Sequence, residues 1–136
     1  MKSILDYPTK IWMAFGETMT GNEKIHQWLL ENGYPELAAL SSSIQGSEEA
    51  LKWLTENGFV EFAILDAAID EQPSAMQWLK KYGLDIELKF AAMCNKDQKC
   101  IAYFNSHDLK IFIHLANKIN EFRDNMIFDV HRRPKC

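Results

Sequence analysis

Apolar and polar residues recur along this chain with a period of 25 residues, and tryptophan marks the period most clearly. Trp28, Trp53 and Trp78 are each followed directly by leucine, and a glycine comes five residues after each of them. A fixed period of this length is typical of a repeat array, in which one supersecondary unit is stacked several times. The main apolar columns of the repeat read Ile4, Leu29, Leu54, Leu79, Phe104; Phe15, Leu40, Leu65, Phe90, Leu115; and Met19, Ile44, Ile69, Cys94, Ile119.

Within each repeat the apolar residues follow helical spacing, so the pattern predicts two short helices per unit. Asn57-Gly58 is typical of a helix end, and Ser47 before two glutamates is typical of a helix start. We expect first helices near 23–32, 48–57, 73–82 and 98–107, second helices near 9–20, 35–45, 60–71, 85–95 and 110–119, and one more first-type helix at 121–130. A column of small residues would let the second helices approach closely: Gly16, Ser41, Asp66, Ala91 and Ala116.

These elements predict an all-α fold, a right-handed α-α superhelix (solenoid) of about five two-helix repeats of 25 residues. Stacked repeats make one continuous core, so we expect a single domain over residues 1–130. The first row breaks the columns at Ser3 and Pro8, as a capping end does. The last six residues, 131–136, are basic and lack apolar positions, which predicts a mobile tail.

Parts of the repeat resemble ankyrin repeats. Phe62–Ala68 followed by Ala75–Gly83 resembles one repeat read from its inner helix, Leu88–Ala92 resembles an inner-helix core, and Leu51–Gly58 resembles an outer helix with its glycine stop. The unit has 25 residues where ankyrin has 33, and the Thr-Pro-Leu-His turn is absent, which would match loss of the β-hairpin fingers. The resemblance implies a non-enzymatic protein-binding scaffold with its inner helices on a concave face. Another short α-solenoid is the alternative.

Composition and charge narrow the function classes. Hydrophobic residues make up 47% of the 136 residues and charged residues 25%, which is typical of a globular protein. The net charge of −4 argues against a general nucleic-acid binder, and residues 1–68 are especially acidic, with 4 basic and 10 acidic groups. Neither a secretory signal nor an apolar run long enough for a membrane is evident, so we expect a cytoplasmic protein without membrane contact.

The candidate catalytic and metal-binding residues have structural interpretations. The tryptophans share a column with Tyr103 and are expected in the core. Cys94 and Cys100 fall in apolar columns and should be buried, whereas Cys136 should be exposed. His26 is expected to be partly buried, and His107 to end a helix. The serines at 41–43 lack an evident base. We therefore predict no cofactor, no metal and no enzymatic activity.

The remaining signal is a surface that changes while the core repeats. Two columns of the second helices lie four residues apart and run from small to basic: Ala14, Ala39, Ile64, Lys89, His114 and Thr18, Ser43, Ala68, Met93, Lys118. Such variable positions give a solenoid its specificity, although they would also vary if merely solvated. We predict that another protein or a peptide binds along this inner-helix strip, at Ile64, Lys89, Met93, His114 and Lys118.

Two other functions stay open at this point. A small enzyme or ligand-binding protein with an unrecognised site is the first alternative. A helical solenoid that binds nucleic acid through its lysines is the second. Self-association through the exposed ends of the array is also open.

Overall fold

Helices make up the regular structure of the described chain. The computed structural model describes residues 2–128, and these residues contain no strand. The elements are a short 3-10 helix η1 (Ile4–Asp6), followed by α1 (Thr9–Thr18), α2 (Glu23–Glu31), α3 (Pro35–Ile44), α4 (Glu48–Glu56), α5 (Val60–Ile69), α6 (Pro73–Lys81), α7 (Asp85–Met93), α8 (Gln98–Ser106) and α9 (Lys110–Phe128). The all-α prediction is confirmed, and α1 to α8 lie where the apolar pattern places them.

The positions that end one helix and begin the next repeat in the register of the sequence. Asn22, Ser47 and Asp97 cap α2, α4 and α8, because each side chain accepts a hydrogen bond from the backbone amide three residues on. Positive φ angles recur after α2, α4, α6 and α8 at Gly33, Gly58, Gly83 and Asp108, and after α1, α3, α5 and α7 at Gly21, Gly46, Glu71 and Lys96. Since glycine adopts positive φ without steric cost, the predicted glycine stops are confirmed.

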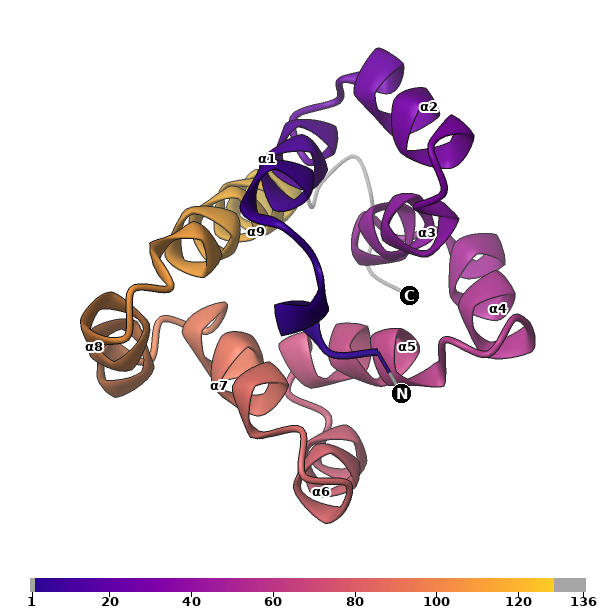
Figure 1. Cartoon of the computed structure of the whole chain (residues 1–136). Helices are drawn as coiled ribbons and strands as arrows, with labels where there is room; N and C mark the ends of the chain where they lie inside the picture. Colours follow the sequence, from indigo (N-terminus) through magenta and orange to yellow (C-terminus); the bar gives the residue numbers. More distant parts are fainter. Residues whose placement is uncertain (1, 129–136) are drawn as a thin grey trace.

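The helices form two concentric layers (Figure 1). α1, α3, α5, α7 and α9 make an inner ring in which each helix contacts the next, and α9 contacts α1. α2, α4, α6 and α8 lie outside, each packed against the inner helix before it and the inner helix after it. An extended superhelix would keep its first and last repeats apart, so this closure departs from the predicted solenoid. The handedness of the array stays a prediction.

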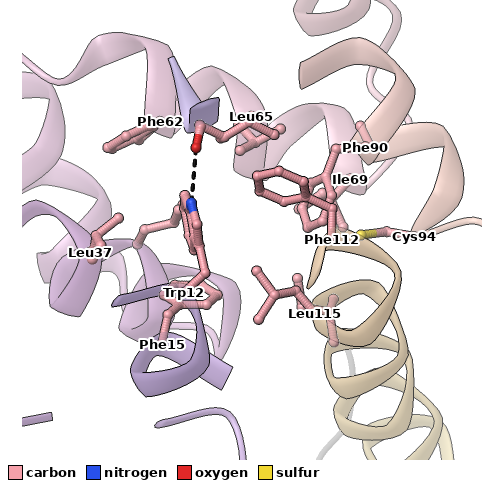
Figure 2. Packing of buried hydrophobic residues seen from close by; sticks show 14 of the residues in the cluster. Trp12, Phe15, Leu37, Phe62, Leu65, Ile69, Phe90, Cys94, Phe112 and Leu115 are labelled. Carbon is pink, nitrogen blue, oxygen red and sulfur yellow. Dashed lines mark hydrogen bonds between the residues drawn. The ribbon is translucent and has the colours of Figure 1, made fainter. Parts of the chain in front are cut away.

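The middle of the ring is a packed core and not a channel. Each inner helix contributes one side chain of the same column, and all five are at most 4% exposed: Phe15, Leu40, Leu65, Phe90 and Leu115. Figure 2 shows several of these side chains converging from different helices. The void between them is about 10 Å³, which is at most the space of one water molecule. The concave inner face that the ankyrin resemblance implies is therefore filled.

The chain before α1, residues 2–7, lies across the mouth of the ring where α3, α5 and α7 begin (Figure 1). We call this segment the N-terminal plug. Its Ile4 belongs to the column that is buried under the outer helices, at Leu29, Leu54, Leu79 and Phe104, and it is itself only 1% exposed. In this structure, however, Ile4 fills the centre of the ring instead of an outer-layer position. The N-terminal plug belongs to the part of the sequence that is predicted to be a capping end, and it closes the ring at its mouth.

Buried glutamates in the first turns of the inner helices hold the plug. Glu87 Oε2 accepts hydrogen bonds from Ile4 N and Ser3 Oγ, each at 2.8 Å. Glu61 Oε2 accepts one from Lys2 N at 2.6 Å. Both glutamates are 3% exposed, and a carboxylate in the first turn of a helix is stabilised by the unpaired amides there. Among the described side chains, Glu61 Oε1 is buried without a hydrogen-bond partner.

Two aromatic residues extend this network. The Tyr7 hydroxyl donates to Glu36 Oε2 at 2.6 Å, and burial together with this carboxylate raises the pKa of Tyr7 well above its ordinary value. The hydroxyl therefore stays protonated and keeps donating. Trp12 Nε1 donates to the carbonyl oxygen of Ile4 at 2.9 Å, the dashed line of Figure 2.

The last helix differs from the prediction. We expected a helix at 110–119 and a second one at 121–130, but α9 runs without a break from Lys110 to Phe128. In the other repeats the turn at this point has a residue with positive φ and then, in three of four cases, a capping side chain. Phe122 occupies the capping column and cannot accept a hydrogen bond from an amide, so no new helix start is encoded. Residues 129–136, with the predicted tail, lie outside the described part of the chain.

α9 also crosses the ends of two inner helices. Arg123 of α9 forms an ion pair with Asp70 at 3.7 Å, just after α5, and donates to the carbonyl oxygen of Cys94 at 3.5 Å, just after α7. A cation at the carboxyl ends of helices is electrostatically favourable.

Gly16 is the closest point of the contact that closes the ring. A Cβ atom added at Gly16 would lie 3.2 Å from Leu115 Cδ2 and 3.7 Å from His114 Nε2. This distance to Leu115 is shorter than ordinary van der Waals contact, so α1 can approach α9 this closely only with a very small residue at the position. The predicted role of the small-residue column is confirmed here.

The plug should contribute strongly to stability. We expect Glu87→Ala to lower the free energy of unfolding by about 2–3 kcal/mol, because the buried amide of Ile4 loses its acceptor. Glu56→Ala, which removes an exposed glutamate, should change it by less than about 0.5 kcal/mol. Urea unfolding followed by circular dichroism measures both values. Equal effects would show that the plug does not stabilise the ring.

The closure can be tested by adding volume at Gly16. We expect Gly16→Val to lower the free energy of unfolding by about 2 kcal/mol through overpacking against Leu115. Gly16→Ala should have a smaller effect, because alanine gains about 1 kcal/mol of helix propensity. A double-mutant cycle with Leu115→Ala checks the cause, since the two changes should compensate each other. Strict additivity would contradict the contact.

Candidate functional site

The five predicted contact residues do not form one continuous strip in the structure. Met93 is 1% exposed and lies in the core, so it is not available to a partner. Met93 shares its column with Ser43, and this column faces the next inner helix. Ser43 of α3, for example, donates a hydrogen bond to Asp66 of α5. Of the other predicted residues, Ile64, Lys89 and Lys118 are half-buried and His114 is exposed.

The column with Ala39, Ile64 and Lys89 faces outwards, between neighbouring outer helices. Ala39 forms part of the floor of a groove between α2 and α4. The Lys89 ammonium lies 5.0 Å from the ring centre of Tyr103, on α8. In this column, Ala39 of α3 therefore lies at the floor of an outer groove, and Lys89 of α7 lies beside the outer helix that follows it. His114 stands apart from these, beside Gly16 at the contact of α9 with α1.

A hollow lies between α2 and α4, with α3 as its floor. Two adjoining cavities of about 690 and 400 Å³ share His26, Ser42 and Ser47 in their walls. We call this feature the α2–α4 groove. Leu30, which is 43% exposed, and the half-buried Trp53 face its apolar end. Together the two cavities offer a site of the length that a peptide segment needs.

The composition of α2 sets this groove apart from the others. The column of His26 otherwise holds Leu51, Met76 and Ile101, whereas the column of Leu30 otherwise holds Thr55, Lys80 and Asn105. α2 is thus polar at His26, where the other outer helices are apolar, and apolar at Leu30, where they are polar. The two positions are four residues apart and so lie on one helix face. Sequence analysis missed Leu30 and Trp53 as site residues, although the break in the Leu30 column was a detectable signal.

His26 has well-defined partners at the centre of the groove. Its Nε2 lies 3.0 Å from Ser42 Oγ and 3.2 Å from the carbonyl oxygen of Ala38. A carbonyl can only accept, so the contact with Ala38 is a hydrogen bond in the tautomer whose Nε2 carries the proton. In that tautomer Nε2 cannot remove a proton from Ser42, which is what a serine nucleophile would require. The pair therefore acts as a hydrogen-bonded wall of the groove, and the prediction of a partly buried His26 is confirmed.

The groove is also acidic. Glu23 lines its polar end and Glu49 its apolar end, and both side chains are exposed. They belong to the half of the chain that carries 4 basic and 10 acidic groups. Such a rim attracts a positively charged segment and disfavours an acidic one.

The predicted core position of the tryptophans holds only in part. Trp53 and Trp78 are half-buried and pack against the core, whereas Trp28 is 41% exposed at the outer surface. Each ring packs against an aromatic residue at or after the end of its own helix. The pairs are Trp28 with Tyr34, Trp53 with Phe59, Trp78 with Tyr82, and, in the same column, Tyr103 with His107. Aromatic stacking at the helix ends accounts for the repeat of tryptophan.

The described thiols are poorly suited to nucleophilic chemistry. Cys94 is 2% exposed, and burial raises its pKa to about 12. Cys100 is half-buried, and burial followed by the nearby Asp97 carboxylate raises its pKa as well. The expected burial is confirmed for Cys94 and holds in part for Cys100. Cys136 lies outside the described residues.

Other predicted structural roles are supported. Ser41 is fully buried and accepts a hydrogen bond from Thr18 Oγ1 at 2.6 Å, which joins α1 to α3. His107 is the residue at which α8 ends, as predicted.

Within residues 2–128, no three His, Cys, Asp or Glu side chains come together as metal ligands would. No described helix has the length and apolarity needed to cross a membrane.

Comparison with protein-family models, curated proteins and solved structures finds no match to this chain. The resemblance to ankyrin repeats therefore stays a prediction. The function proposed below therefore rests on the geometry and chemistry of the α2–α4 groove.

The buried thiol gives a direct test of this environment. In a Cys100→Ser/Cys136→Ser variant, we expect Cys94 to be about a thousandfold less ionised at pH 8 than a thiol of ordinary pKa. Its reaction with a disulfide reagent should therefore be very slow until urea unfolds the chain. A matched variant that retains only Cys100 should react faster. Equal native rates for the two variants would contradict the burial of Cys94.

Proposed function

We propose that this protein is a non-enzymatic protein-interaction module that binds a peptide or helical segment of another protein in the α2–α4 groove. The observation that carries the proposal is the combination of an extended hollow with an apolar edge formed by the exposed Leu30 and the half-buried Trp53. Peptide-binding grooves generally combine apolar anchor pockets with polar groups that fix orientation.

The chemistry of the groove suggests what the partner carries. Apolar side chains of a partner would pack against Leu30 and Trp53, and its polar groups would meet His26 and Ser42. The acidic residues Glu23 and Glu49 favour lysine or arginine beside those apolar anchors. We therefore propose a basic, partly apolar segment as the partner.

The other functions considered from the sequence receive less support. In the tautomer that donates to the Ala38 carbonyl, Nε2 of His26 does not provide the base that a catalytic Ser42 would need. Of the lysines that a nucleic-acid stripe would use, Lys89 contacts Tyr103 and Lys96 pairs with Asp124 at 3.8 Å. Two of the remaining predicted contact residues, Lys89 and Lys118, represent the competing surface in the experiment below.

Affinity capture with site-specific variants tests the proposal. We expect Leu30→Glu to reduce recovery of a stoichiometric partner, with affinity falling by about thirtyfold if Leu30 is an anchor. Val60→Glu is the matched control, because Val60 is similarly exposed, at 37%, but lies outside the groove. Circular dichroism should be unchanged in both variants.

The competing surface is assessed in the same experiment with Lys89→Glu/Lys118→Glu. Loss of the partner in this variant, with full recovery by Leu30→Glu, would reject the α2–α4 groove and support the strip predicted from the sequence. Equal recovery by all three variants would place the binding site elsewhere.

A further inference from the structure

Within the described chain, one contact between neighbouring inner helices has no outer helix over it. α2, α4, α6 and α8 each cover the line of contact between two successive inner helices, but no described outer helix covers the contact of α9 with α1 (Figure 1). We call this contact the α1–α9 seam. In the register of the repeat, the residues before α1 and those near the end of α9 would form the missing helix. The former make the N-terminal plug instead, and the latter continue α9.

Side-chain exposure shows that the seam resembles the other contacts between inner helices but lacks their outer helix. Met13 of α1 shares its column with Ala38 and Ala63, which are 0% and 8% exposed beside the preceding outer helix. Met13 is 46% exposed, although it is apolar. Leu88 and Ile113, at the same position of α7 and α9, are half-buried. The position is thus buried or half-buried where an outer helix precedes it and exposed where none does.

The other side of the vacant position is hollowed as well. A cleft of about 410 Å³ lies between α8 and α9, and Ile101, Ile113 and Asn117 are among its walls. These residues correspond in register to His26, Ala38 and Ser42 of the α2–α4 groove. In that groove α4 supplies the far wall, whereas at this cleft the continuation of α9 contributes Glu121 and Asp124 and no separate outer helix is described.

The four existing outer helices show what kind of element fits such a position. Each has nine residues and places one large apolar side chain, Leu29, Leu54, Leu79 or Phe104, at 0% exposure between two inner helices. An amphipathic helix of about this length would make the same contacts at the seam.

Charge on the two seam helices adds a further requirement. One column at the start of the inner helices reads Lys10, Pro35, Val60, Asp85, Lys110. Only the two helices that border the seam carry lysine there, and both lysines are exposed. An outer helix runs antiparallel to its inner neighbours, so its last turn would lie near Lys10 and Lys110. An acidic residue in that turn, such as Glu31 of α2 or Glu56 of α4, would complement them.

We propose that the α1–α9 seam is a docking site for one amphipathic helix of a partner protein, about nine residues long, with a large apolar side chain at its centre and an acidic last turn. This helix would complete the outer layer of the ring. The site is separate from the α2–α4 groove and does not depend on the function proposed for it.

A peptide taken from the chain itself is the probe. Residues 47–58, which form α4 with its cap and glycine stop, have the apolar and acidic positions that the seam requires. Fluorescence anisotropy of the labelled peptide should show saturable binding to the full chain. We expect Met13→Glu to weaken it by about tenfold, and Lys10→Glu/Lys110→Glu by about fivefold. Val60→Glu, with an apolar residue of similar exposure replaced, should bind as the wild type does.

Several outcomes would overturn the proposal. These are no saturable binding, equal binding of a scrambled peptide, or equal affinities for Met13→Glu and Val60→Glu. Sedimentation equilibrium tests whether a second copy of this chain occupies the seam instead. A wild-type dimer that Met13→Glu converts to a monomer would assign the seam to that second copy. Restored affinity when a Glu56→Lys peptide meets Lys10→Glu/Lys110→Glu would confirm the predicted orientation. An unchanged circular dichroism spectrum shows that the variants are folded.

Discussion

The contact between α1 and α9 determines how the remaining helices are used. Because Gly16 allows these two helices to pack closely, five inner helices surround one core and leave no concave face. The columns that would line the inside of an open array meet at the centre, at Phe15, Leu65 and Phe90 among others (Figure 2). Every surface on which a partner can bind therefore lies on the outside of the ring or at its two mouths.

Closure also creates a problem at the mouth, where the helix starts meet. Buried carboxylates there are costly unless donors satisfy them. The N-terminal plug supplies those donors from Lys2, Ser3, Ile4 and Tyr7, while Trp12 fixes the plug from below. The plug covers the core with Ile4, which is 1% exposed, and gives each of these glutamates a hydrogen-bond donor, although Glu61 Oε1 is left without one.

The two proposed binding surfaces lie where one repeat departs from the others. α2 differs from α4, α6 and α8 at His26 and Leu30, and this exchange gives the α2–α4 groove an apolar edge beside a polar centre. The seam differs because an outer helix is missing and Met13 is left exposed. In both places the structural repeat serves as the reference that makes the departure visible.

The sequence by itself determined the helices and their ends, because these depend on residues close together in the chain. Apolar spacing, the capping side chains of Asn22 and Ser47, and the positive φ of Gly33 and Gly58 act within a few residues. It also determined that the main apolar columns are buried. It misplaced the column of Met93, which is buried, and it placed the tryptophans only in part. Their fixed register was visible, but whether the rings face the core or the surface depends on how the layers pack.

Only the tertiary structure decided the ring, the plug and the grooves. Ile4 and Glu87 are 83 residues apart in the sequence, and Gly16 meets Leu115 from the opposite end of the chain. The repeat pattern describes how each unit packs on the next, and it is equally compatible with an open or a closed array. Whether the ends meet depends on the small rotation between units summed over all repeats, and on which residues are small enough to let the first and last helices touch.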